Sequence, residues 1–198
     1  MIGKKKVITA VCIGIAVMTG LICISCNKIP GWVTWEKRQI KDATGEYEVT
    51  LSSRAVSVSR SSDQKIIWKS QKGVKVQDVL SCDIDGDGND ELILLCWKRG
   101  RFGKYRPFWI EQDEKEWSQH IFVYRYAENQ PAPMWMSSYI GQDVVKIDAK
   151  PDSKQKYYLI LTDRNGKNSN WVWNYWGFLL VDHDESFCEK IETKIIKL

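Results

Sequence analysis

The residues whose types and spacing best suit chemistry stand in the stretch CDIDGDGNDELILL, from Cys82 to Leu95. Carboxylates fall at alternating positions, at Asp83, Asp85 and Asp87, and glycines separate them. Alternating side chains of a tight loop can converge on one point, and Ca²⁺ takes about six to eight such hard oxygen ligands. Carboxylates this close repel one another unless a cation neutralises them. The stretch therefore predicts a calcium-binding loop; the alternative is a solvated acidic turn without metal.

The expected ligands are carboxylates and one backbone carbonyl, from Asp83, Asp85, Asp87, Asn89 and Glu91. Gly86 and Gly88 permit the positive φ angles that such a wrap requires. An EF-hand is excluded, because its loop needs a bidentate Glu at the twelfth position and flanking helices. That position holds Leu94, inside a β-type run. Ligands from consecutive positions leave few open coordination sites, so the expected role of the ion is structural.

The elements that must position this loop are strands, because short apolar runs follow one another between turn signals from residue 36 onward. AVSVSR and HIFVYRY alternate between apolar and polar residues, which predicts half-buried strands. ELILLCW and YYLILT are nearly continuous apolar runs, which predicts strands buried on both faces. The 10 tryptophans also favour β structure.

The runs repeat in the same order three times, which predicts three units of four antiparallel strands. The first unit comprises KRQI, EYEVTL, AVSVSR and KIIWKS. The second comprises VQDVL, ELILLCW, HIFVYRY and PMWMSS, with an extra stretch after its second strand. The third comprises VVKIDA, YYLILT, WGFLLVD and FCEKIE. Units of about 40–50 residues with four strands are typical of propeller blades. The expected fold class is all-β, a propeller-like array of about three four-stranded antiparallel blades preceded by an N-terminal apolar helix.

The stretch VLSCDIDGDGNDELILL resembles the repeat of integrin-like propellers, the FG-GAP or VCBS type. In that family a D-x-D-x-D-G-x-x-[DE] loop joins two strands of a blade and runs directly into a hydrophobic strand. The resemblance covers about 20 residues strongly and the neighbouring units only by strand order. The equivalent loops AKPDSKQK and KDATGE lack the ligand set. The resemblance therefore implies one bound calcium, not one per blade.

The N-terminal segment predicts a membrane connection. Lys4, Lys5 and Lys6 precede the uncharged run from Val7 to Cys26, which is long enough for a signal peptide or a membrane-spanning helix. Ser25 and Cys26 resemble the end of a bacterial lipoprotein signal, in which Cys26 would carry the lipid. An uncleaved single-pass anchor is the alternative that stays open. Both place the remainder outside the cytoplasm, tethered to the membrane.

The expected division is an anchor or signal at 1–26, a linker at 27–35 and the β domain at 36–198. Without the three anchor lysines the net charge of +4 falls to +1. Nucleic-acid binding is not expected, because it requires a concentrated basic face.

Two surface candidates accompany the loop. The first combines cations with aromatic rings and would bind an envelope protein or an anionic or glycan polymer; its residues are Lys98, Arg99, Arg101, Phe102, Lys104, Tyr105 and Arg106. The alternative is that its cations pair with EQDEKE, which follows. The second is the aromatic cluster from Trp171 to Trp176, which suggests a carbohydrate-binding module if exposed and core packing if not.

Catalysis has little support in the sequence. His120 and His183 are the two histidines, and no nucleophile elbow, zinc-protease motif or P-loop occurs. Cys82, Cys96 and Cys188 are expected to be buried thiols; a Cys96–Cys188 bond stays open. The sequence thus predicts a non-enzymatic, calcium-binding envelope module for binding or scaffolding.

Overall fold

The computed structural model describes residues 28–102 and 108–181, and the chain forms β-strands throughout this part. The predictions for residues 1–26, for Cys26 and for Cys188 concern residues outside these ranges. Within these described ranges no helix has the length and apolar character needed to cross a bilayer.

The strands form three four-stranded antiparallel sheets, which confirms the all-β fold class and the grouping into three units. The first sheet comprises β1 (Arg38–Lys41), β2 (Tyr47–Ser52), β3 (Ala55–Arg60) and β4 (Ile66–Lys69). The middle sheet comprises β5 (Lys75–Cys82), β6 (Glu91–Arg99), β7 (Trp117–Ala127) and β8 (Gln130–Met136). The third sheet comprises β9 (Val144–Pro151), β10 (Tyr157–Asp163), β11 (Asn168–Asn174) and β12 (Gly177–Val181). In each sheet, neighbours in sequence are neighbours in space.

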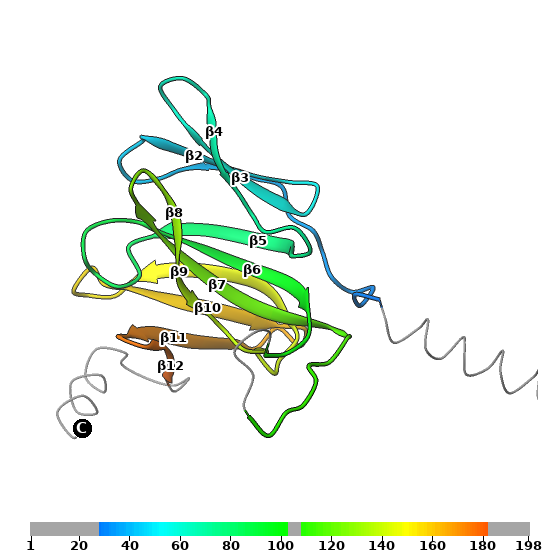
Figure 1. Cartoon of the computed structure of the whole chain (residues 1–198). Helices are drawn as coiled ribbons and strands as arrows, with labels where there is room; N and C mark the ends of the chain where they lie inside the picture. The colour runs from blue at the N-terminus through cyan, green and yellow to red at the C-terminus, as the bar shows by residue number, and fades with distance from the viewer. Residues whose placement is uncertain (1–27, 103–107, 182–198) are drawn as a thin grey trace, which may run out of the picture.

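Two hydrophobic layers hold the sheets together in a stack (Figure 1). Val49, Leu51 and Val58 of the first sheet pack against Leu92 and Leu94 of the middle sheet. A second layer joins the opposite face of the middle sheet to the third sheet, and its members include Ile93, Leu95, Val123, Ile147 and Leu159. The middle sheet is therefore covered on both faces.

The place of each strand in the middle sheet or an outer sheet explains which burial predictions were correct. β6 is buried on both faces from Glu91 to Trp97, as its continuous apolar run predicts. The half-buried prediction for HIFVYRY is wrong, because β7 lies in the middle sheet and is buried from Ser118 to Tyr124. The prediction of two buried faces for YYLILT is also wrong. β10 belongs to an outer sheet, and only Leu159 and Leu161 of that strand are buried.

The third unit uses different strands from those expected. Its third strand is NSNWVWN, which is β11, and its fourth is β12, which covers most of the expected third strand WGFLLVD. The expected fourth strand FCEKIE lies outside the described residues. The asparagines of β11 make its sequence look like a loop, but Trp171 and Trp173 form an apolar face that packs on the second layer.

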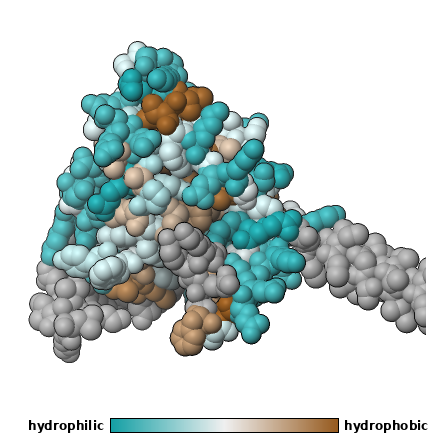
Figure 2. Space-filling view, in the orientation of Figure 1, coloured by the Kyte–Doolittle hydropathy of each residue, from teal (hydrophilic) through white to brown (hydrophobic). Residues whose placement is uncertain are grey.

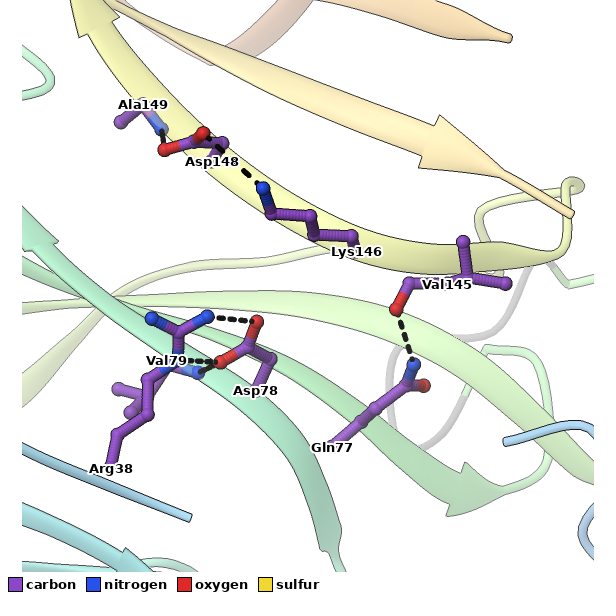
Figure 3. Close-up of polar contacts among 8 residues, drawn as sticks. All are labelled: Arg38, Gln77, Asp78, Val79, Val145, Lys146, Asp148 and Ala149. Atoms are coloured by element: carbon purple, nitrogen blue, oxygen red, sulfur yellow. Dashed lines mark hydrogen bonds and ion pairs between the residues drawn. The ribbon is translucent and has the colours of Figure 1, made fainter. Parts of the chain in front are cut away.

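Polar side chains also join the sheets (Figure 3). Arg38 of β1 forms an ion pair with Asp78 of β5, and Arg38 Nη2 lies 3.0 Å from Asp78 Oδ2. On the other side of β5, Gln77 Nε2 donates to the carbonyl of Val145 in β9 at 3.3 Å. Strand β5 thus lies between β1 and β9.

Cys82 and Cys96 are free, buried thiols, as expected. Burial raises the pKa of Cys82 to about 12 and also raises the pKa of Cys96. Both stay protonated at neutral pH and act as small apolar core residues.

Candidate metal centre

The aspartate loop is the turn between β5 and β6. Cys82 ends β5 and Glu91 begins β6, and the two residues are paired across the strands, so both ends of the loop are neighbours in space. Asp83 therefore begins the loop beside the residue that ends it. This pairing brings together two carboxylates that are eight positions apart in the chain.

Asp83, Asp85 and Glu91 form a carboxylate triad that could hold a metal ion. One carboxylate oxygen from each residue lies within 4.8 Å of the other two. Asp83 and Asp85 are half-buried, whereas Glu91 is 1% exposed. Three hard anionic ligands converging from one loop match the ligand chemistry of Ca²⁺.

Backbone amides hold the loop in this shape. Gly86 N donates to Asp83 Oδ1 at 2.7 Å, and Gly88 N donates to Asp83 Oδ2 at 2.9 Å. Both glycines have positive φ, +79° and +92°, which side-chain-bearing residues rarely adopt. Ile84 is fully buried in the second hydrophobic layer and anchors the start of the loop.

Glu91 is the electrostatically unusual member of the triad. Ile84 N donates to Glu91 Oε2 at 3.1 Å. Burial, and after it the negative charge of Asp85, raise the pKa of Glu91 to about 8. Arg125 approaches the triad from β7, with Nη2 3.7 Å from Asp85 Oδ2. A divalent cation would compensate the charge that burial disfavours in Glu91.

Asp87 and Asn89 lie outside the triad. The backbone N–H and the side-chain amide of Asn89 donate to Asp87 Oδ1 at 2.8 and 3.1 Å. Asp87 and Asn89 thus bond to each other in an exposed turn, and their place in the calcium ligand set stays a prediction.

The sequence pattern does not identify Asp90, which links the loop to the first sheet. Its Oδ2 accepts hydrogen bonds from Ala43 N at 2.9 Å and from Ser81 Oγ at 3.1 Å. Asp90 stands at an even position of the loop, where the metal pattern marks no ligand. Ala43 lies in the turn between β1 and β2, and no local signal connects it with Asp90.

The basic and aromatic candidate follows β6. Arg101 Nε pairs with Glu114 Oε2 at 2.8 Å, so one cation of this candidate pairs with an acidic residue that follows. Lys98 is half-buried and Arg99 is exposed at the end of β6, and Phe102 is half-buried. Lys104, Tyr105 and Arg106 lie outside the described residues.

The aromatic cluster is divided between core and surface. Trp173 is 8% exposed and belongs to the second layer, and Trp171 is half-buried with Nε1 donating to Ser169 Oγ at 2.9 Å. Tyr175 and Trp176, at the turn between β11 and β12, are 91% and 92% exposed. Trp171 also lines a groove of about 370 Å³ with Ile140, Gly141, Gln142, Asp163, Lys167, Ser169 and Leu180.

His120 is fully buried in β7, between Ser118 Oγ at 2.8 Å and the carbonyl of Ser137 at 3.1 Å. Burial lowers the pKa of His120, so the ring is neutral at physiological pH. These contacts give it a packing role. His183 lies outside the described residues.

Comparisons with protein-family models, with curated proteins and with solved structures found no match to this chain.

Proposed function

We propose that this protein is an extracytoplasmic, membrane-tethered module of FG-GAP/VCBS-like propeller blades that binds one Ca²⁺ and serves binding or scaffolding at the cell envelope. The single observation that carries the proposal is the carboxylate triad of Asp83, Asp85 and Glu91 at the mouth of the β5–β6 hairpin. The ion ties the turn to the buried start of β6 and compensates the desolvated Glu91 carboxylate.

The propeller assignment draws support from how the sheets are connected. Each sheet is a four-stranded antiparallel meander, and the three sheets stack face to face in chain order. Their first strands are neighbours, since β5 contacts both β1 and β9. Propeller blades are likewise four-stranded sheets that follow one another around a central channel.

The test is thermal unfolding of the full chain, purified in detergent, with calcium and with chelator. A ligand at a hundred times its dissociation constant adds about 2.7 kcal/mol to the free energy of unfolding. We expect a calcium-specific rise in melting temperature that Asp85→Asn abolishes. The matched control is Asp152→Asn, at the equivalent hairpin of the third sheet, where Asp152 accepts N–H bonds from Lys154 and Lys156.

Equal melting of stripped and calcium-loaded protein would show that the triad binds no calcium, and the proposal would lose its main support. A rise that Asp152→Asn removes as effectively as Asp85→Asn would place the ion elsewhere. Magnesium in place of calcium checks the choice of ion, because Mg²⁺ requires a tighter octahedral ligand set.

A second candidate is carbohydrate binding at the β11–β12 turn. The observation that favours it is the exposure of Tyr175 and Trp176, since exposed aromatic rings are available to stack on sugar rings. Envelope polysaccharides should quench tryptophan fluorescence of the wild type but not of Trp176→Ala. Trp109→Ala, another exposed tryptophan, is the control. Undiminished quenching in Trp176→Ala would exclude this site.

A further inference from the structure

The loop between β6 and β7 carries an exposed aromatic pair. Phe108 is 94% exposed and Trp109 is 67% exposed. Their ring centroids are 4.8 Å apart with the planes at 82°, so the two rings pack edge to face. Figure 2 shows brown apolar surface at the lower edge of the molecule, on the side from which this loop leaves in Figure 1. Contiguous exposed apolar surface is typical of an interaction site.

Two acidic side chains of the loop, those of Asp113 and Glu114, are engaged at its neck. Gly100 N donates to the carbonyl of Glu116 at 2.9 Å, which closes the neck. Asp113 Oδ1 accepts from Arg101 N at 2.8 Å, and Glu114 pairs with the Arg101 side chain at 2.8 Å. The charge of Glu114 is thus compensated near the neck, and the aromatic pair lies farther out along the loop.

Cations and aromatic rings also alternate around the neck. The Arg99 guanidinium lies over the Trp117 ring at 5.2 Å, and that of Arg101 lies over the Tyr139 ring at 4.9 Å. Tyr139 is 43% exposed. Aromatic rings with a polar edge, placed beside arginines, are the side chains that membrane interfaces favour.

The loop leaves from the end of the molecule where the chain enters the domain, here called the Trp32 end. Trp32 packs edge to face on Trp97 of β6 at 5.8 Å, and Arg164 lies over the Trp32 ring at 5.2 Å. Trp97 precedes the neck at Gly100 by three positions. Residues 27–31, between the expected anchor and Trp32, span at most about 17 Å when fully extended. The Trp32 end therefore stays within that distance of the membrane surface.

We propose that Phe108 and Trp109 insert into the interface of the membrane that holds the anchor, with the Arg99 side chain at the level of the headgroups. The inference rests on the tether in the proposed function. It orients the domain with its Trp32 end on the bilayer. β11 runs away from Arg164 for about 23 Å, so Trp176 points away from the lipid. The calcium loop lies at the same distal end. It joins β5 to the start of β6, whereas Trp97 and the neck lie at the other end of β6.

The experiment uses the full chain, labelled with fluorotryptophan, in nanodiscs of phosphatidylcholine and phosphatidylglycerol with and without a doxyl-labelled lipid. Trp109→Phe and Trp176→Phe assign the two fluorine resonances. The doxyl lipid should broaden the Trp109 resonance beyond detection and leave the Trp176 resonance unchanged. Phe108→Ser, which removes half of the aromatic pair, should restore part of the lost Trp109 signal.

Equal resonances with and without the doxyl lipid would overturn the proposal, and would indicate that the loop faces a protein or polymer instead. Broadening of Trp176 in place of Trp109 would reverse the orientation and also overturn it. Failure of the chain to co-purify with nanodiscs would refute the tether itself, and this orientation with it. Loss of calcium stabilisation would leave the membrane result intact, so the two proposals fail separately.

Discussion

At the scale of single residues, Glu91 couples the fold to the candidate ion. It opens β6, it is 1% exposed, and burial raises its pKa to about 8. In the unfolded chain a glutamate titrates near 4.5. The folded protein therefore holds this proton to higher pH than the unfolded chain, and the protonated form favours folding.

The sign of the resulting pH dependence is definite for metal-free protein. The contribution of Glu91 is fully present below pH 4.5 and is lost as pH rises to about 8. By pH 7 the loss is about 3 kcal/mol. Denaturant unfolding across this window should show the decline in wild type relative to Glu91→Gln, with Glu46→Gln as an exposed control. Excess calcium should remove this decline in the wild type. Parallel pH profiles for the metal-free wild type and Glu91→Gln would contradict the prediction.

Gly177 is a second residue whose identity the packing demands. Its φ is +145°, and an added Cβ would lie 2.8 Å from Trp135 Nε1. Trp135 cannot move away easily, because it packs on Trp173 at 6.1 Å and on Phe178 at 5.5 Å.

We expect Gly177→Ala to lower the free energy of unfolding by about 3 kcal/mol, from backbone strain and overpacking together. The control Gly166→Ala shares a positive φ of +78° but meets nothing within 4 Å, so it should cost only about 1 kcal/mol. Chemical denaturation measures both. Equal costs would mean that the contact with Trp135 contributes nothing.

At the scale of elements, a buried amide joins the middle sheet to the third. The side-chain amide of Gln119 in β7 pairs with the backbone of Val144 in β9. Val144 N donates to Gln119 Oε1 at 2.9 Å, and Gln119 Nε2 donates to the Val144 carbonyl at 2.7 Å. Gln77 joins this network through its Oε1, which accepts from Gln119 Nε2 and from Trp97 Nε1 at 2.9 Å each. The network fixes how the third sheet sits on the middle one.

Gln119→Met keeps the side-chain volume but leaves the buried N–H of Val144 without its partner. The Val144 carbonyl and Gln77 Oε1 each lose one donor and keep another, Gln77 Nε2 and Trp97 Nε1. An unpaired buried group costs about 1–3 kcal/mol, so we expect a loss of about 1–3 kcal/mol. Gln39→Met on the exposed face of β1 is the matched control and should cost less than about 0.5 kcal/mol. Similar losses for the two variants, measured by urea unfolding, would remove the special role of Gln119.

At the scale of the whole molecule, the middle sheet is shared by both hydrophobic layers, while the outer faces differ. The exposed face of the first sheet is hydrophilic on β1–β3, where its residues include Gln39, Lys41, Glu48, Thr50, Ser57 and Ser59. On β4 this face carries Ile66, which is 50% exposed. The corresponding face of the third sheet carries Ile160, Val172 and Leu179, of which Leu179 is 49% exposed. The outer face of the first sheet is thus more hydrophilic than that of the third.

Because the layers share the middle sheet, the three sheets should unfold together. Leu94 belongs to the first layer and Ile93 to the second, and both are fully buried. Leu94→Ala and Ile93→Ala should each cost about 2–5 kcal/mol and lower one common melting transition. Hydrogen exchange followed at Val58 and at Leu159 reports the two outer sheets. Early exchange of only one sheet in either variant would show that the sheets unfold independently.

Much of the fold was predictable because its signals are local. Strand periodicity and turn residues gave the first two units correctly, since side chains alternate along any strand. The triad was predictable because Asp83, Asp85 and Glu91 lie in one short loop whose glycines dictate its shape. The order of the strands within each sheet followed from their succession along the chain, with short turns everywhere except between β6 and β7.

What the sequence determined by itself was therefore the local part: an all-β chain of four-stranded units and one acidic loop with converging carboxylates. Only the tertiary structure decided that β7 is buried on both faces and β10 on one, because burial depends on which sheet lies in the middle. It alone placed Asp90 against Ala43 and Gln119 against Val144. Such contacts join segments distant in the chain, and their free energy exists only once the sheets have stacked.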